Sequence, residues 1–192
     1  MLLRRHFNQL FFAHYLGVRH QWSQLLQYRK IHIIGGPGSG KTFSSTKLQG
    51  LTRLNSYDLD KVFWEQNKNS YIRSSEESRA EKLNQILSQD NWIVEGVYYK
   101  WLADSFRDAD LIVILNPPVL LRQWRIFKRF LKRKFILGQF RKESLASFME
   151  MYWWNQKFDK DNMVRILEFL TEHENKIIFC KNYNELWHKI NA

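Results

Sequence analysis

The stretch that decides the fold is Gly35-Gly36-Pro37-Gly38-Ser39-Gly40-Lys41-Thr42, which has the pattern G-x-x-x-x-G-K-T. Its glycines let consecutive backbone N–H groups turn inward, so that the loop forms a concave nest for anionic oxygens. Lys41 adds a mobile positive charge for the β- and γ-phosphates, and the Thr42 hydroxyl is suited to ligate Mg²⁺. The pattern therefore predicts a loop that binds a nucleoside triphosphate, either ATP or GTP.

The segments on both sides of the loop decide whether the match is meaningful. Residues 31–34, Ile-His-Ile-Ile, are typical of a buried strand. Residues 42–51 predict a helix that points its positive end at the same phosphates and has Gly50 as its C-terminal cap. The alternative, a glycine-rich turn whose lysine binds nothing, would not need a buried strand before it and a helix after it. The expected nucleotide-binding residues are Gly35, Gly36, Pro37, Gly38, Ser39, Gly40, Lys41, Thr42 and Phe43.

Two aspartates follow the next predicted strand, which covers residues 53–57 and ends at Asp58-Leu59-Asp60. Because side chains alternate along an extended segment, we expect both carboxylates on one side of it. Ligands of open α/β sheets collect at the carboxyl ends of strands. Asp58 is therefore predicted to contact Mg²⁺ through water, and Asp60 to hold an acceptor hydroxyl. The alternative is that one of them only caps the helix that follows.

A third carboxylate, Glu95, ends the strand predicted over residues 91–96. A hydrophobic strand with an acid at its end is a common way to place a Mg²⁺ or water ligand near nucleotide phosphates. We predict that Glu95 contributes to the site, the alternative being an exposed carboxylate at the sheet edge. Tyr98 is expected either to line an acceptor pocket or to belong to the core.

The run 109–115 is almost continuously apolar, as expected of a central parallel strand. Asn116 is predicted to cap the next helix, with Pro117 at its first position. That helix is expected to run from Val119 to about Lys134. Its predicted buried face consists of Leu120, Leu121, Trp124, Phe127 and Leu131.

The same helix opens a basic block with nine cationic residues and no acid between Arg122 and Lys142. Arg125 and Arg129 are four residues apart, so they share a helix face and could both reach one triphosphate. We predict that they neutralise charge on a transferred phosphoryl group. The alternatives are a solvated basic face and a nucleic-acid-binding patch.

The remaining segments are predicted from periodicity and capping residues. Residues 65–75 are expected to be a polar loop, and Ser74 or Ser75 to cap a helix over 76–89. Arg73 and Arg79 are expected on the solvated surface, the alternative being that either contacts a substrate phosphate. Further helices are predicted over 144–158, 161–174 and 184–190, with a strand over 176–180. Residues 1–29 are predicted to form a helical extension that packs on the domain, the alternatives being dimerisation and contact with an anionic surface.

Composition narrows the class of protein. The chain has 192 residues, which suits one domain, and its net charge of +11 favours an anionic ligand or surface. The single cysteine, Cys180, excludes an intramolecular disulfide and a cysteine-only zinc site, and it fits a reducing cytoplasm. No apolar stretch approaches the roughly 18–20 residues of a membrane span, and no signal peptide is expected.

The order of predicted elements resembles the adenylate-kinase-related group of P-loop proteins and, more narrowly, the family of DNA topology modulation proteins. The matching segments are residues 33–42, Tyr-Asp-Leu-Asp-Lys-Val-Phe-Trp at 57–64, Trp-Ile-Val-Glu-Gly-Val-Tyr at 92–98, and 111–133 with its Trp124-Arg125 and Lys128-Arg129 pairs. They cover residues 30–135 well and the remainder loosely. Residues 1–29 have no counterpart in the family, and the arginine-containing substrate motif of adenylate kinases is absent.

The resemblance implies an α/β P-loop NTPase fold, with a five-stranded parallel sheet, helices on both faces and a basic helical lid over about residues 125–158. It also implies ATP or GTP and Mg²⁺ as ligands. Asp60 matches the family's strand-end aspartate, and Glu95 stands where the family has an aspartate. Arg125 and Arg129 resemble the arginine pair that opens the adenylate kinase lid. We therefore expect a kinase-like domain over residues 30–192, preceded by the extension 1–29.

The first hypothesis is a cytoplasmic, Mg²⁺-dependent phosphotransferase that acts on an unknown small acceptor. Its predicted catalytic residues are Lys41, Asp60, Arg125 and Arg129; the acceptor-binding residues are Asp60, Glu95 and Tyr98; the metal-binding residues are Thr42 and Asp58. The alternatives are a nucleotide-dependent nucleic-acid-binding protein that uses residues 122–142, and an ATP-binding scaffold without catalysis.

Overall fold

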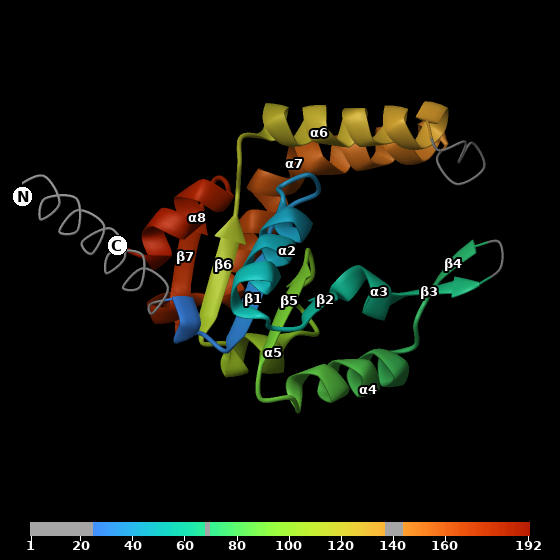
Figure 1. Cartoon of the computed structure of the whole chain (residues 1–192). Helices are drawn as coiled ribbons and strands as arrows, with labels where there is room; N and C mark the ends of the chain where they lie inside the picture. Colours follow the sequence, from blue (N-terminus) through green and yellow to red (C-terminus); the bar gives the residue numbers. More distant parts are fainter. Residues whose placement is uncertain (1–24, 68–69, 137–143) are drawn as a thin grey trace, which may run out of the picture.

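The structure, a computed structural model, describes residues 25–67, 70–136 and 144–192. A five-stranded parallel sheet forms its centre, in the order β2-β5-β1-β6-β7. An antiparallel hairpin of β3 and β4 extends to one side of it (Figure 1). The strands are β1 (Lys30–Ile34), β2 (Ser56–Asp58), β3 (Trp64–Asn67), β4 (Ser70–Arg73), β5 (Trp92–Gly96), β6 (Leu111–Leu115) and β7 (Ile177–Cys180).

Helices cover both faces of the sheet, which confirms the predicted fold class (Figure 1). They are α2 (Lys41–Thr52), α3 (Leu59–Phe63), α4 (Glu76–Leu87), α5 (Ala103–Asp108), α6 (Val119–Leu131), α7 (Leu145–Phe169) and α8 (Tyr183–Ile190), with a π-helical turn η1 (Lys132–Ile136) and a 3₁₀ turn η2 (Thr171–Lys176). One apolar core lies under α3, α4, α5 and α7, and a second lies under α2 and α8.

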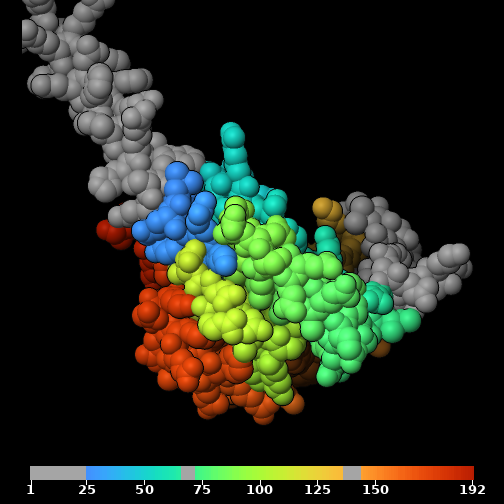
Figure 2. Space-filling view, turned by 90° about the horizontal axis from the view of Figure 1, so that it is seen from below, coloured from blue at the N-terminus to red at the C-terminus, as the bar shows by residue number. Residues whose placement is uncertain are grey.

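The central strands are buried on both faces, which is why they are apolar almost throughout. Every residue of β5 and β6 is buried. Seen from below in Figure 2, the yellow-green residues around α5 lie between the green α4 and the orange and red C-terminal segments. The second core also includes Leu25, whose side chain is fully buried although it precedes β1.

Gly50 does not end α2, contrary to the prediction. The helix continues to Thr52, and Arg53 ends it in a left-handed conformation with φ 61°, its N–H donating to the Gln49 carbonyl oxygen. The extra turn places Leu51 and Leu54 against the second core, so packing decides where the helix stops.

Two other element predictions are wrong. Residues 65–75 are not a loop: most of them belong to the β3–β4 hairpin and the start of the segment leading to α4, where cross-strand backbone hydrogen bonds satisfy a polar stretch. The helices predicted over 144–158 and 161–174 are one continuous helix, α7. Phe158 and Met163 lie on either side of the predicted break, and both are buried in the first core. A continuous helix keeps both side chains on the face that packs on that core.

The largest correction concerns α6. Leu120, Leu121, Trp124 and Phe127 are exposed, and the buried residues of this helix are Arg122, Gln123, Ile126 and Phe130. The reason is that α6 packs through its more polar side on α7, where Arg122 donates to Asp159 at 2.7 Å. The predicted cap is also wrong, because Pro118 is the N-cap and Asn116 instead accepts a hydrogen bond from Arg122.

Candidate functional site

The glycine loop lies between β1 and α2, and the backbones of α6 and β6 pack closely against it. Gly38 and Gly40 have φ values of 72° and 101°, which L side chains rarely adopt. A Cβ atom on Gly38 would lie 2.7 Å from the Arg122 carbonyl oxygen, and one on Gly35 would lie 2.3 Å from the Leu115 carbonyl oxygen. The glycines are therefore required both by backbone conformation and by close contact with α6 and β6.

The amino end of α2 has no side-chain cap. Gly40 occupies the N-cap position, and the first turn contains no acid. By contrast, α4, α7 and α8 are capped by Ser75, Ser144 and Asn182. The first amides of α2 have no intrahelical partners, so with the positive end of the helix dipole they suit an anion. The side chain of Phe43 lies away from this end, edge-on to Tyr183 at 6.0 Å.

Lys41 reaches back along the loop. Its Nζ donates to the carbonyl oxygens of Gly35 at 2.9 Å and Gly36 at 3.1 Å. Burial lowers the pKa of the amine, while the carboxylates of Glu95, Asp60 and Asp58 act in the opposite direction. A partly buried ammonium beside several acids is a group that a phosphate oxygen can bind.

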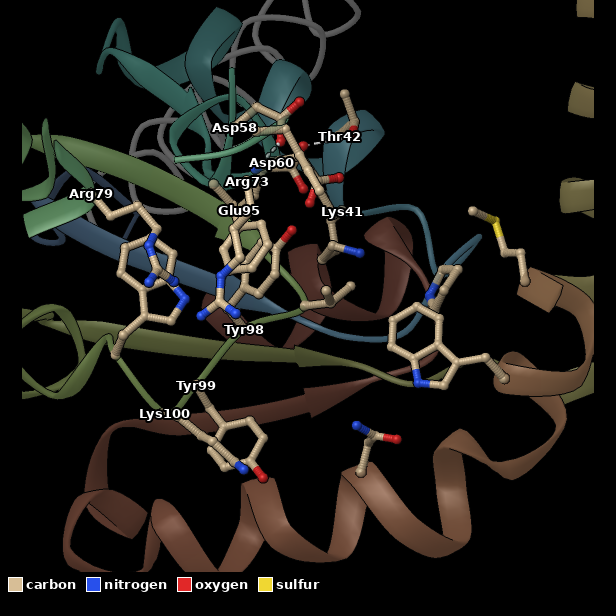
Figure 3. A pocket seen from close by; sticks show the side chains of 18 of the residues that line it. Lys41, Thr42, Asp58, Asp60, Arg73, Arg79, Glu95, Tyr98, Tyr99 and Lys100 are labelled. Atoms are coloured by element: carbon tan, nitrogen blue, oxygen red, sulfur yellow. Dashed lines mark hydrogen bonds between the residues drawn. The ribbon is translucent and has the colours of Figure 1, made fainter. Parts of the chain in front are cut away.

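The side chains of Thr42, at the start of α2, and Glu95, in β5, are in direct contact. The Thr42 hydroxyl donates to Glu95 Oε1 at 2.6 Å, and Glu95 pairs in register with Asp58 on the neighbouring strand. Burial raises the pKa of Glu95, an effect partly offset by the Thr42 hydrogen bond and the Lys41 charge. Glu95 therefore lies beside the hydroxyl predicted to bind metal, as Figure 3 shows.

The two aspartates do not alternate along one strand as predicted. β2 ends at Asp58, whose side chain caps α3 by accepting from the Asp60 N–H at 2.9 Å. Asp60 lies in the first turn of that helix. Even so, both carboxylates line the same cavity as Lys41 and Thr42 (Figure 3). Burial raises the pKa of Asp58, and the backbone hydrogen bond from Asp60 opposes the rise.

The donor set around Thr42 fits Mg²⁺ shared with phosphates better than a protein-only metal cage. Across residues 25–67, 70–136 and 144–192, no group of three or more His, Cys, Asp or Glu side chains is arranged to hold a metal ion. Mg²⁺ bound with nucleotides needs only one or two protein oxygens, with phosphates and waters supplying the rest. Thr42, Glu95 and Asp58 line one cavity and would be the residues to supply such a partial shell.

The cavity continues from the loop to an aromatic wall that is formed by Phe63, Tyr98 and Trp101. The volume of the whole cavity is about 1410 Å³. The Tyr98 ring stacks on Phe63 at 4.5 Å, and burial followed by interaction with Asp60 raises the pKa of its hydroxyl. The guanidinium of Arg79 lies 5.0 Å from the Phe63 ring centre and 5.6 Å from that of Trp101.

Arg79 was predicted at the solvated surface, and that prediction is wrong. Only 5% of the residue is exposed, because it is enclosed by the rings of Phe63 and Trp101. Arg73 is mostly exposed yet also lines the cavity, since β4 pairs with β3 and brings it back beside Phe63 at 5.2 Å. No local sequence signal marks either position, because the hairpin that assembles them is itself a tertiary feature.

The basic block is divided among three environments. Arg125 Nη1 donates to the carbonyl oxygens of Gly38 and Ser39, both at 3.1 Å. Arg129 lines the cavity, donates to Met151 Sδ at 3.2 Å and lowers the pKa of Lys41 after the larger effects of burial and the acids. Arg122 is buried, whereas Lys128 and Lys132 are exposed. Residues 141 and 142 lie outside the described part of the chain.

Comparison with known proteins shows the fold. No family model matches the chain, and no curated protein matches it significantly either. Shikimate kinase from Acinetobacter baumannii in complex with shikimate has a TM-score of 0.51 and 17% identity over 84% of this chain and 90% of its own. This chain has the same fold as that shikimate kinase.

Two further solved structures score lower. Deoxyadenosine kinase from M. mycoides with bound dATP has a TM-score of 0.46 and 13% identity, covering 85% of this chain and 100% of its own. A gluconokinase from Sinorhizobium meliloti 1021 has a TM-score of 0.48 and 14% identity, covering 85% and 90%. The narrower resemblance to DNA topology modulation proteins stays a prediction.

Among the described residues, no helix combines the length and the apolar character needed to cross a bilayer.

Proposed function

We propose that this protein is a Mg²⁺-dependent phosphotransferase that transfers the γ-phosphoryl group of ATP or GTP to a small hydroxyl or phosphate acceptor. The observation that carries the proposal is one cavity with two different ends. Lys41 and the uncapped start of α2 line one end, and Trp101 and Arg79 line the other. Asp60 interacts with both Lys41 and Tyr98, so it lies between the two ends. A donor and an acceptor bound in that cavity would share a single space, which is what transfer between them requires.

At the donor end, the loop amides and Lys41 would hold the phosphates. The Lys41 amine now donates to two loop carbonyls, and phosphate oxygens would offer it stronger, charge-assisted partners. Thr42 and Glu95, with Asp58, would hold Mg²⁺; the ion supplies charge neutralisation between the phosphates. This assigns Glu95 to the metal end of the cavity rather than to the acceptor.

At the acceptor end, Asp60 would orient the attacking hydroxyl and accept its proton. Tyr98, whose raised pKa keeps its hydroxyl protonated, would hold the Asp60 carboxylate in place. Arg125 and Arg129 would neutralise the charge that develops on the transferred group. Arg125 already contacts the loop, so it needs only a small rearrangement to reach a phosphate.

The first test is a screen for phosphoryl transfer. Mg-ATP and Mg-GTP would be incubated with nucleosides, nucleotides, sugars and hydroxy acids, including shikimate, with ADP or GDP release and the phosphorylated product as readouts. Lys41→Ala should lower turnover at least about 100-fold while the protein stays folded, because it removes a charge from the transition state. Lys47→Ala, an exposed lysine on the same helix, is the matched control and should keep wild-type turnover.

The outcome distinguishes the proposal from its rivals. Equal nucleotide affinity and turnover in wild type and Lys41→Ala would end the proposal. Nucleotide binding without any product would leave the scaffold hypothesis. Hydrolysis that needs DNA or RNA, with strong salt dependence of binding to that polymer, would favour the nucleic-acid hypothesis.

A further inference from the structure

The outward side of α6 is apolar and exposed. Leu120, Leu121, Trp124 and Phe127 recur at helical spacing on the side opposite Arg122 and Ile126. The exposed fractions of Leu120 and Trp124 are 76% and 55%. Scattered exposed apolar residues are ordinary, but a continuous stripe with a tryptophan marks an interaction surface.

The stripe continues across the neighbouring helix, which lies beside α6 above the sheet (Figure 1). Ring contacts link Trp124 to Phe127 at 5.9 Å, Phe127 to Phe148 at 6.1 Å, Phe148 to Tyr152 at 6.3 Å and Tyr152 to Trp153 at 5.6 Å. Trp153 is exposed, as are Met149 one turn before it and Leu145 two turns before it. We call this surface the α6/α7 face and define it by Leu120, Trp124, Phe127, Leu145, Met149 and Trp153.

Lysines border the α6/α7 face. Lys128 Nζ lies 5.8 Å from the centre of the Trp124 ring. Lys157 and Lys160 are exposed and follow Trp153 within two turns of α7. Residues 119–136 contain no acid. Of the four acids on α7, Glu150 lines the cavity and Asp159 is paired with Arg122. Asp161 and Glu168 are exposed and follow Trp153 by about two and four turns. The surface thus combines apolar side chains with positive charge.

We propose that the α6/α7 face binds the surface of an anionic phospholipid bilayer. A bilayer accepts leucine and phenylalanine at the acyl boundary, tryptophan at the headgroup level and lysine in contact with anionic headgroups. Single-stranded nucleic acid would use the rings and lysines, but it offers nothing to Leu120, Leu145 or Met149. A second copy of the chain would bring lysines against lysines. Charge and shape together therefore favour the lipid surface.

The proposal does not rest on phosphotransferase activity. The cavity lies on another side of α6, where Arg125 contacts the glycine loop at Gly38 and Ser39. Substitutions on the outward side can therefore be made without touching the candidate active site, and binding to lipid can be measured without any nucleotide present.

The test is flotation of the full chain with two kinds of vesicle, pure phosphatidylcholine and phosphatidylcholine with about 30% phosphatidylserine. The wild type should float with the anionic vesicles alone, and salt should weaken the binding. Lys128→Glu should reduce the affinity about thirtyfold, since each charge near an anionic bilayer is worth about fivefold. Lys47→Glu is the matched control, because Lys47 lies over the Phe43 ring at 5.7 Å as Lys128 lies over Trp124. It should change affinity by less than about threefold, because the two lysines lie on different helices.

A second pair of variants tests the apolar part. Trp124→Asp should abolish flotation, whereas Leu26→Asp should not, although Leu26 is exposed to the same extent, 56%. Circular dichroism would verify that both variants keep the wild-type fold. Equal binding to neutral and anionic vesicles, no flotation of the wild type, or flotation unchanged in Trp124→Asp would overturn the proposal. So would a dimer in light scattering that Trp124→Asp dissociates, or retention on poly(U) that the same variant abolishes without any vesicle binding.

Discussion

The Thr42 hydroxyl donates a hydrogen bond of 2.6 Å to Glu95 beside the glycine loop. Burial at this place disfavours the charged form of the Glu95 carboxylate. The folded state raises the pKa of Glu95, so around that pKa it binds more protons than the unfolded chain does. The free energy of unfolding should therefore decrease as pH rises through the range above the ordinary pKa of a glutamate. The buried Glu95 carboxylate therefore lowers the free energy of unfolding, and it places a negative charge beside Thr42, the predicted metal ligand.

The corresponding prediction is that Glu95→Gln stabilises the protein while it weakens Mg²⁺-dependent nucleotide binding. The neutral amide can still accept from Thr42 but has no charge to desolvate, so the free energy of unfolding at pH 7 should rise by about 0.5–2 kcal/mol. Denaturant titrations at pH 5 and pH 7 would measure it, and the gain should be smaller at pH 5. A loss of stability at pH 7 would show that Glu95 instead supports the fold through Lys41.

At the scale of elements, α2 ends at Arg53 although its sequence offers a glycine, Gly50, three residues earlier. Arg53 holds a left-handed conformation that is strained for any residue with a Cβ, while Gly50 remains in the regular helix, where an added Cβ would meet no atom within 4 Å outside the helix backbone. Arg53→Gly should raise the free energy of unfolding by about 0.5–1 kcal/mol, because it relieves the strain. Gly50→Ala should raise it by a similar amount through helix propensity. Thermal denaturation of the two variants decides the matter: if Gly50 were the cap, Gly50→Ala would lower the melting temperature.

The same scale explains why the apolar side of α6 is not its buried side. Its periodicity correctly predicts an amphipathic helix, but an apolar stripe is buried only if another element covers it. Here α7 meets the side with Arg122 and Gln123, so the cavity receives Arg125 and Arg129 and the apolar stripe faces outward. Which side of a helix is buried is thus a property of its neighbours.

For the molecule as a whole, the second core extends before the first strand. Leu25 is fully buried among β1, α2 and α8, whereas its neighbour Leu26 is 56% exposed. Leu25→Ala should lower the free energy of unfolding by about 2–5 kcal/mol, because it leaves a cavity in that core. Leu26→Ala should change it by less than about 0.5 kcal/mol. Chemical denaturation of this adjacent pair would measure both; equal effects would mean that residues before Lys30 do not take part in the folded domain.

The sequence by itself determined the central strand, the glycine loop and the helix that follows it, because each depends on residues close together in the chain. The five-stranded parallel sheet followed only from the resemblance to P-loop proteins, because its strands pair across dozens of residues. Glycines at positions of positive φ, a β-branched run and an uncapped helix start are local features with local physical causes. Only the tertiary structure decided where Arg79 lies, that Glu95 meets Thr42, and which side of α6 is buried. Those outcomes depend on contacts between segments dozens of residues apart, whose geometry is set by packing of the whole sheet and its helices rather than by any neighbouring residue.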